Sequence, residues 1–536
     1  MAAGLTSCYD LDTQPMSSVV TEEQRSEIIE SDPSKIDALA SGIYGNYNGW
    51  ELATGEMYDF GVPGIMVQLE SRTQDMVTYN PGLYGWFANC VAYTDNTATS
   101  GYNICRWRIP YNTIYTCNQL ISTVTEVDPE LSDPTMRFYM GQALGNRAYS
   151  YWSLAQIYQF NIVGHEQAPC VPIITEKNQD AVATEGAPRA SVQAVYDQIL
   201  ADLNQAIELM TGNPAAVRDD KRYIDIDVLY GLRARTYLCM QEYDKAAADA
   251  QKVISSGHFA PISADEASAP GFSLLTSQNW IWGINMDEED VHGLYTFTGM
   301  MGSWTYGYAY AGMWKLINAP LWSKLNQRQY DVRKLWWIAP STRLSAAVNY
   351  GATLDGMNAA EYLESVGAPD YAVVKFAPYQ NVLQQDNNAA DVPLMRIEEM
   401  YLILAEAQGL GSAGVAQGKQ TLVDFVNNYR WSGKTAFNLN SIASTEDFLE
   451  EVWFQRRVEL WGEGLNYYDV MRLNKPVNRT EPGTIWGTTS ARNTTSYVYN
   501  IPAEAPLFLS QIPTSEIENN PALTEQNPTD SPNNYR

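Results

Sequence analysis

Apolar residues recur at helical spacing over much of the chain. The clearest stretch covers residues 229–255, where the recurring positions are Ala234, Tyr237, Tyr243, Ala246, Ala250 and Val253. Small alanines let two helices approach closely while tyrosines fill the groove between them, which is the register of a tetratricopeptide repeat. The pattern therefore predicts a helical hairpin that ends at Gly257.

The same periodicity predicts helices over residues 34–47, 102–127, 137–159, 192–210, 396–430 and 445–472. The stretches 137–159 and 396–430 repeat the tetratricopeptide-like pattern. Such units cannot bury their apolar faces alone, so they must stack against one another. Long irregular segments separate them, and we expect a binding site to be built there.

Two of these irregular segments have an unusual composition. Residues 54–99 are rich in Gly, Tyr, Asn and Thr, and residues 272–337 contain seven of the fifteen tryptophans. Within the second segment, residues 294–314 carry no charge, and aromatic residues alternate with others at Trp304, Tyr306, Tyr308 and Tyr310. If this stretch is a strand, all four rings lie on one face. That face is either a platform for sugars or part of the packed core.

Composition narrows the possible partners. A net charge of −28, from 62 acidic and 34 basic residues, disfavours binding to nucleic acid or to anionic lipid. It permits a cation such as Ca²⁺, for which the sequence locates no site. Tyr (35) and Trp (15) exceed Phe (13), which favours a half-wet recognition surface, although tyrosines at helix contacts would give the same count.

No sequence motif for nucleotide binding, metal binding or catalysis is complete in this chain. Gly409–Gly414 matches G-x-G-x-x-G, but a helical pattern precedes it, so it predicts a turn between paired helices rather than a nucleotide site. His165 and Glu166 begin like a zinc-protease motif, but Pro169 replaces the second His. With three His in the chain, we predict no catalytic residue, metal site or cofactor. A carboxylate-pair glycosidase remains open, because 62 acids offer many pairs.

The amino terminus suggests a lipid anchor. Leu5-Thr-Ser-Cys8 resembles a bacterial lipobox, and residues 1–22 are expected to be the remnant of a signal peptide followed by a tether. Cys8 is the expected lipidation site, the alternative being a free thiol. The other five cysteines are an odd number, which argues against a full disulfide framework. No apolar run is long enough to span a membrane, so we expect membrane contact through the lipid alone.

Several sequence motifs, in order along the chain, resemble those of the SusD/RagB family. Residues 393–407 are similar to its R-x-x-E-x-x-L-x-x-A-E-A helix, 456–472 to its R-x-x-E-L-x-x-E-G-x-R-x-x-D-L-x-R helix, and 512–527 to its I-P-x-S-E-I ending. Residues 111–120 and 330–333 match two shorter family patterns. Gln455 and Asn466 depart from the pattern, where the family often has Glu and Arg. These departures put a local ion pair in doubt.

The resemblance implies a mainly α-helical fold. About four tetratricopeptide-like helix pairs would support an irregular, loop-rich ligand face with minor β structure, all within one SusD-like domain over residues 23–536. It implies a cell-surface lipoprotein of the outer membrane that covers a SusC-like TonB-dependent transporter. It also implies binding of oligo- or polysaccharides without catalysis.

The resemblance also suggests site residues, on a ligand face drawn mainly from residues 54–110 and 265–340. Trp86 and Asn89 are similar to a W-x-x-N that contacts sugar in the starch-binding member of the family, and Arg72 and Asp75 precede them. Arg72 and Asp75 could instead form an ion pair that braces a loop. From the charge-free segment we select Trp304, Tyr306 and Trp314, whose alternative role is packing against the helices.

Two other functions compete with sugar binding. A glycosidase would release reducing sugar from a polysaccharide. A tetratricopeptide scaffold would dock protein partners in a groove without tryptophans. The aromatic, charge-free segment favours the sugar-binding interpretation.

Overall fold

Long helices make up most of the fold. The structure is a computed structural model that describes residues 36–289, 291–342, 345 and 350–536, so Cys8 and the expected tether over residues 1–22 lie outside the described residues. The scaffold helices are α2 (Ile36–Asn48), α5 (Gly101–Val127), α6 (Pro134–Tyr158), α8 (Val192–Met210), α9 (Ile226–Cys239), α10 (Tyr243–Ser256), α16 (Ile397–Leu410), α17 (Val415–Tyr429), α18 (Thr445–Glu459) and α19 (Asn466–Arg472).

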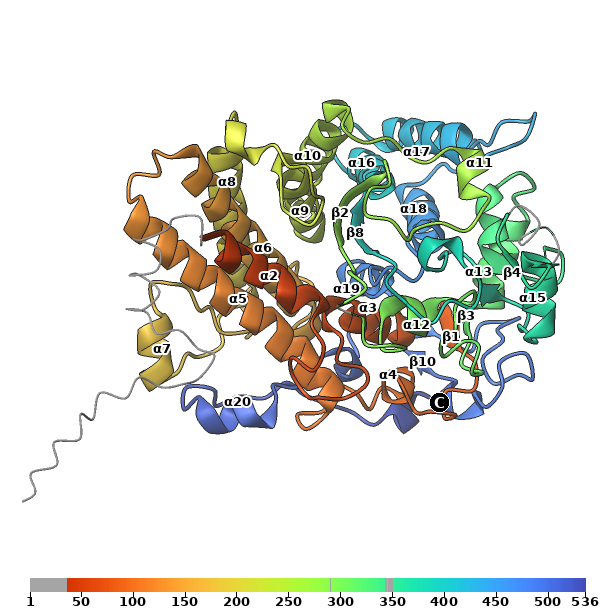
Figure 1. Ribbon diagram of the computed structural model, residues 1–536, viewed down its shortest axis with the longest axis horizontal. Helices are drawn as coiled ribbons and strands as arrows, with labels where there is room; N and C mark the ends of the chain where they lie inside the picture. The colour runs from red at the N-terminus through yellow and green to blue at the C-terminus, as the bar shows by residue number, and fades with distance from the viewer. Residues whose placement is uncertain (1–35, 290, 343–344, 346–349) are drawn as a thin grey trace, which may run out of the picture.

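These helices stack in sequence order. Helix α5 packs on α6, α6 on α8, α8 on α9, α9 on α10, α10 on α16, and α16 on both α17 and α18. The predicted hairpin over residues 229–255 is the pair α9 and α10, which ends at Gly257 with φ of +72°. Figure 1 shows α2, α5, α6 and α8 together at one end of the molecule. The mainly α-helical fold of tetratricopeptide-like pairs is therefore confirmed.

The helix predicted over residues 445–472 is wrong as a single element. The chain leaves α18 after Glu459 and enters α19 at Asn466. Gly462 and Gly464 adopt φ of +80° and +76°, a region that favours glycine. A Cβ on Gly464 would lie 2.7 Å from the Cβ of Met66. The break therefore allows close contact with a neighbouring helix, which sequence periodicity alone did not reveal.

Short helices and strands fill the rest of the molecule. The remaining helices are α3 (Gly61–Arg72), α4 (Ala88–Ala92), α7 (Gln179–Glu185), α11 (Ala264–Ala267), α12 (Phe297–Met301), α13 (Ala319–Asn326), α15 (Ala359–Ser365) and α20 (Thr514–Asn519). The strands are β1 (Met76–Thr78), β2 (Trp280–Ile284), β3 (Lys315–Ile317), β4 (Trp337–Ile338), β5 (Thr353–Leu354), β6 (Met357–Asn358), β7 (Ala372–Val373), β8 (Val392–Arg396), β9 (Val477–Asn478) and β10 (Asn500–Ile501).

A small antiparallel sheet positions the irregular face. Its strands run in the order β1-β3-β7-β4, and Thr78 of β1 pairs with Lys315 of β3. This sheet lies at the end of the molecule away from α5 and α8 (Figure 1). The loop after β1 and the loop before β3 therefore leave the sheet side by side. Helix α3, buried along its whole length, comes shortly before β1 in the chain.

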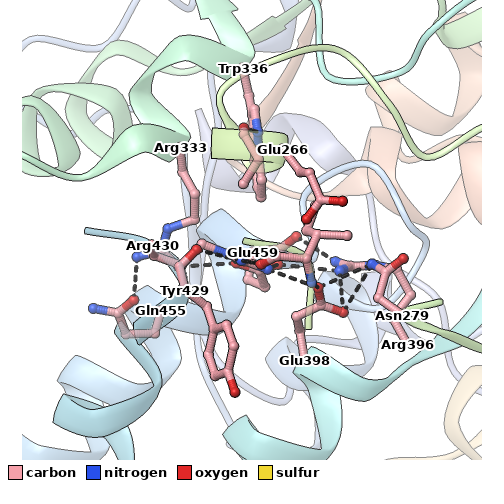
Figure 2. A network of polar contacts seen from close by, with 12 residues as sticks. Glu266, Asn279, Arg333, Trp336, Arg396, Glu398, Tyr429, Arg430, Gln455 and Glu459 are labelled. Atoms are coloured by element: carbon pink, nitrogen blue, oxygen red, sulfur yellow. Dashed lines mark hydrogen bonds and ion pairs between the residues drawn. The ribbon is translucent and has the colours of Figure 1, made fainter. Parts of the chain in front are cut away.

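Buried charges join these elements to the scaffold. Glu459 of α18 accepts hydrogen bonds from Arg430 Nε and Nη2, both at 2.8 Å, and lies 3.3 Å from Nη1 of Arg396 and of Arg333 (Figure 2). Arg430 also pairs with Glu398 at 3.0 Å. All five side chains are buried. Burying so many charges is tolerable only because each has an opposite charge and hydrogen bonds nearby.

The two departures from the family pattern have structural explanations. Gln455 accepts a hydrogen bond from Arg333 Nη2 at 2.6 Å, so an amide takes a place within the network (Figure 2). It also donates a hydrogen bond to Glu451 at 2.7 Å. Asn466 donates to the backbone carbonyl of Arg457 at 3.5 Å. Both uncharged side chains therefore form hydrogen bonds at positions where the family pattern often has a charged residue.

Candidate functional site

Trp86 lies on the loop between β1 and α4 and is half-buried. Its ring meets those of Tyr295 and Tyr308 edge-on, with centroids 6.5 and 6.2 Å apart. Asn89, at the start of α4, is exposed and accepts a hydrogen bond from the Thr94 hydroxyl at 3.3 Å. Asn89 is therefore accessible to a ligand, and Trp86 is accessible through part of its ring, since its indole nitrogen is buried.

Arg72 and Asp75 are not accessible, although the sequence suggested them as ligand contacts. Arg72 is buried in an ion pair with Asp95, which also pairs with Arg106. Asp75 accepts two hydrogen bonds from Arg457, at 2.7 and 2.5 Å, and is also buried. The two side chains therefore hold α3 and β1 to the rest of the fold, each with its own partner, and they do not pair with each other.

The charge-free segment is not a strand. A short helix, α12, and a series of turns take its place, closed by a hydrogen bond from the Tyr308 amide to the Gly299 carbonyl at 2.8 Å. Without strand geometry the rings do not share a face. Trp304 is 0% exposed and Tyr308 is 6% exposed, whereas Tyr306 and Tyr310 are 45% and 40% exposed. The expectation of four rings on one face was wrong.

Trp304 and Trp314 belong to the core. Trp314 is 3% exposed, and the Trp304 indole donates to the Val374 carbonyl at 3.1 Å. The other five tryptophans of residues 272–337 are also buried: Trp280, Trp282, Trp322, Trp336 and Trp337. The packing alternative therefore holds for every tryptophan of this segment, and of the residues predicted there only Tyr306 reaches the surface.

Several large apolar side chains are exposed on these two segments. We call the exposed Leu83, Tyr84, Tyr306 and Tyr310, together with the half-buried Trp86, the aromatic surface. Tyr84 and Trp86 both contact the ring of Tyr308, which stands between Tyr306 and Tyr310 in the chain. Tyr306 and Tyr310 have centroids 5.4 Å apart with planes inclined by 46°. Two loops thus converge to present tyrosine faces to solvent.

A second aromatic stack borders this surface. Trp50 stacks on His292 and on Tyr295, with centroid distances of 5.2 and 4.8 Å. Tyr295 in turn contacts Trp86 and Tyr308. This stack was not predicted, because Trp50 lies outside both segments with the unusual composition.

Burial shifts the pKa values of two side chains beneath the aromatic surface, Tyr308 and Lys315. Burial, and next the hydroxyl of Tyr295, raise the pKa of Tyr308. Lys315 of β3 is buried, donates to the Thr78 hydroxyl at 3.0 Å, and has its pKa lowered by burial to about 7. This amine therefore links the two strands from which the aromatic loops depart.

Neither a metal site nor a membrane span is evident in the part of the chain that the structure describes. Within those residues no group of three or more His, Cys, Asp or Glu side chains is placed to hold a metal ion. No helix there is both long and apolar enough to cross a bilayer. The cysteines in the described ranges are free and buried: Cys90, Cys105, Cys117, Cys170 and Cys239.

Comparison with known proteins identifies the family. The family model described as "Starch-binding associating with outer membrane" matches residues 23–238, and the model of the SusD family matches residues 326–529. The SusD-like protein P38 of Formosa agariphila is 23% identical over 412 residues, which cover 72% of this chain and 75% of that protein.

Solved structures share the fold over nearly the whole chain. A SusD-like carbohydrate-binding protein from Bacteroides vulgatus superposes with a TM-score of 0.72 at 23% identity, covering 92% of this chain and 97% of that one. A laminarin-binding SusD-like protein superposes with a TM-score of 0.61 at 18% identity, covering 92% and 99% of the two chains. The scaffold of stacked helix pairs and the two family matches lead to one conclusion: the chain belongs to the SusD/RagB family.

Proposed function

We propose that this protein binds oligo- or polysaccharides at the aromatic surface without transforming them. The observation that carries the proposal is the inclined pair of exposed rings, Tyr306 and Tyr310, on either side of Tyr308, whose own ring contacts Tyr84 and Trp86. The C–H face of a sugar ring stacks on such a ring, while the tyrosine hydroxyl remains free to hydrogen-bond at the edge. The carbohydrate-binding relative and the laminarin-binding relative with the same fold support this choice of ligand.

The proposal includes delivery of the bound glycan to a SusC-like TonB-dependent transporter. A lipid on Cys8 would hold the protein at the outer face of the outer membrane, in agreement with the outer-membrane association in the description of the matching family model. Co-purification from native membranes tests this step. A TonB-dependent transporter should be recovered with the protein, and recovery of the protein alone would contradict the partnership.

Glycan binding is tested with the double variant Tyr306→Ala/Tyr310→Ala in affinity electrophoresis on gels that contain a polysaccharide. Each stacking ring contributes about 0.5–1.5 kcal/mol beyond its area, so loss of two should weaken binding roughly 5- to 150-fold. Tyr115→Ala is the matched control, because Tyr115 is 59% exposed on α5, outside the aromatic surface. Equal retardation of the wild type and the double variant refutes the assignment, and release of reducing sugar by the wild type would indicate an enzyme.

A further inference from the structure

A loop rich in side-chain amides lies beside the aromatic surface. We call residues 379–388 the amide loop. Six of its ten residues are Asn or Gln: Gln380, Asn381, Gln384, Gln385, Asn387 and Asn388. The first two are exposed, the next three are half-buried, and Asn388 is buried. This segment contains no tryptophan and lies outside the segments with the unusual composition, so its sequence carries no signal for a sugar site.

Backbone hydrogen bonds fix the amide loop to the segment that carries the exposed tyrosines. The Gln384 amide donates to the Trp304 carbonyl at 2.7 Å, and the Tyr306 amide donates to the Gln385 carbonyl at 3.1 Å. The Asn388 side chain donates to the Gly293 carbonyl at 3.0 Å and accepts from the Thr305 hydroxyl. The loop is thus held against Tyr306 and the two residues before it.

The backbone of the amide loop is strained. Gln380, Asn381 and Gln384 adopt φ of +53°, +58° and +57°, the left-handed region that residues with a Cβ rarely occupy. Each such residue destabilises the chain locally and persists only when its surroundings enforce it. Strain of this kind is concentrated at ligand clamps and other functional sites. Three such residues within five positions therefore indicate that the loop is held for a purpose other than local stability.

Some of these amides lack partners. Among the described residues, the side chain of Gln384 has no hydrogen-bond partner, and the Oδ1 atom of Asn387 is buried without one. A side-chain amide offers two donor hydrogens and an acceptor oxygen. The Asn387 oxygen is closed to solvent, so the groups open to a ligand are the half-buried Gln384 amide and the nitrogen of the half-buried Asn387 amide. These groups can serve the hydroxyl groups of a sugar whose ring stacks on the adjacent tyrosines.

Two carboxylates lie at or in the amide loop among the described residues, those of Glu288 and Asp386. Residues 294–314 and 79–87 carry no charge. Glu288 accepts a hydrogen bond from the Tyr379 hydroxyl at 2.8 Å, and Asp386 lies within the amide loop itself. An anionic polysaccharide would meet repulsion here, whereas a neutral one would not.

We infer that the amide loop is the polar edge of the glycan site, and that Gln384 and Asn387 select neutral glycans through their hydroxyl groups. This inference rests on the proposed function, because it places the ligand on Tyr306 and Tyr310. It adds to that function a substrate class and two residues that determine specificity.

The experiment compares Gln384→Ala/Asn387→Ala with wild type by affinity electrophoresis. The neutral polysaccharides are laminarin, starch, galactomannan and xyloglucan, and the anionic ones are alginate, polygalacturonate and carrageenan. The matched control is Gln417→Ala/Asn440→Ala, which removes one Gln and one Asn amide at exposed positions in and after α17. Thermal melting verifies that all proteins are folded. Each lost hydrogen bond is expected to weaken binding roughly 2- to 10-fold.

The expected result is retention of the wild type and the control on at least one neutral polysaccharide, with at least fivefold weaker retention of the amide variant. Retention should not change between low and high salt, because a neutral ligand carries no charge to screen. Retention by anionic polysaccharides alone, or equal retention of the amide variant, would overturn the inference and leave glycan binding in place. Failure of the wild type to bind any of the seven would overturn the proposed function and this inference with it.

Discussion

Replacing Glu459 with Gln tests the buried charge network. In the described part of the chain the network holds four cations, Arg333, Lys375, Arg396 and Arg430, and four carboxylates, those of Asp331, Glu398, Glu459 and Glu463. Burial alone would raise the pKa of Glu459, but Arg430 and then Arg396 and Arg333 lower it well below its usual range. The carboxyl group is therefore ionised at neutral pH.

Gln preserves the shape of Glu459 but leaves four buried cations facing three carboxylates. Removing one member of a buried ion pair costs about 3–5 kcal/mol, because the remaining charge stays desolvated and unpaired. The Gln amide hydrogens would also face the guanidinium donors of Arg430. We expect a loss of this size in the free energy of unfolding, measured by urea denaturation at pH 7.

The matched control is Glu518→Gln, which makes the same chemical change at an exposed position and should alter the free energy of unfolding by less than about 0.5 kcal/mol. Since a depressed carboxyl pKa stabilises the fold above the pKa of the unfolded chain, about 4.3, the difference between wild type and Glu459→Gln should shrink only in stronger acid. Equal stability of the Glu459 variant and the control at pH 7 would refute this account of the network.

Three further changes test other parts of the account. Trp304→Ala should destabilise the fold by about 3–5 kcal/mol in urea denaturation, because it empties a fully buried site; an exposed platform residue would show almost no loss. Burial lowers the pKa of Lys315 from 10.5 to about 7, so this side chain contributes a stability term that rises with pH between these values, because the unfolded state binds more protons. Lys315→Met should therefore be favoured over wild type more at about pH 7.5 than at about pH 10, and a stability difference that does not change with pH would contradict it. Gly464→Ala should lower the melting temperature, because its φ is +76° and its Cβ would meet Met66; an unaltered temperature would show that the turn can relax.

The helical scaffold was readable from the sequence because its signal is local. Apolar spacing predicted α8 over residues 192–210 and the hairpin of α9 and α10, where each helix buries one face against its neighbours. The break between α18 and α19 was missed, because its cause is the close approach of Gly464 to Met66, which lies far away in the sequence. Periodicity within a segment contains no information about such distant contacts.

The candidate site was predicted less well, for a related reason. Aromatic alternation from Trp304 to Tyr310 was interpreted with strand geometry, but the chain turns there, so alternate rings point inward and outward. The number of tryptophans did not distinguish a sugar-binding platform from a packed core, because Trp is common in both. Tyr306 and Trp86 were placed at accessible positions, whereas the stack on Trp50 depends on contacts between loops.

The amide loop illustrates the same limit. Its composition alone predicts only a polar connection between β7 and β8. Its relevance comes from two backbone hydrogen bonds to the tyrosine segment and from left-handed residues at Gln380, Asn381 and Gln384. Neither feature leaves a local pattern in the sequence, so only the folded structure brings this loop to the candidate site.

The most direct measurement is a crystal structure of the protein with a polysaccharide fragment that it retains on a gel. The account predicts sugar rings stacked on Tyr306 and Tyr310, with hydroxyl groups within hydrogen-bonding distance of Gln384 or Asn387. Sugar density on a different face, such as the exposed side of α5 around Tyr115, with the aromatic surface empty, would contradict it.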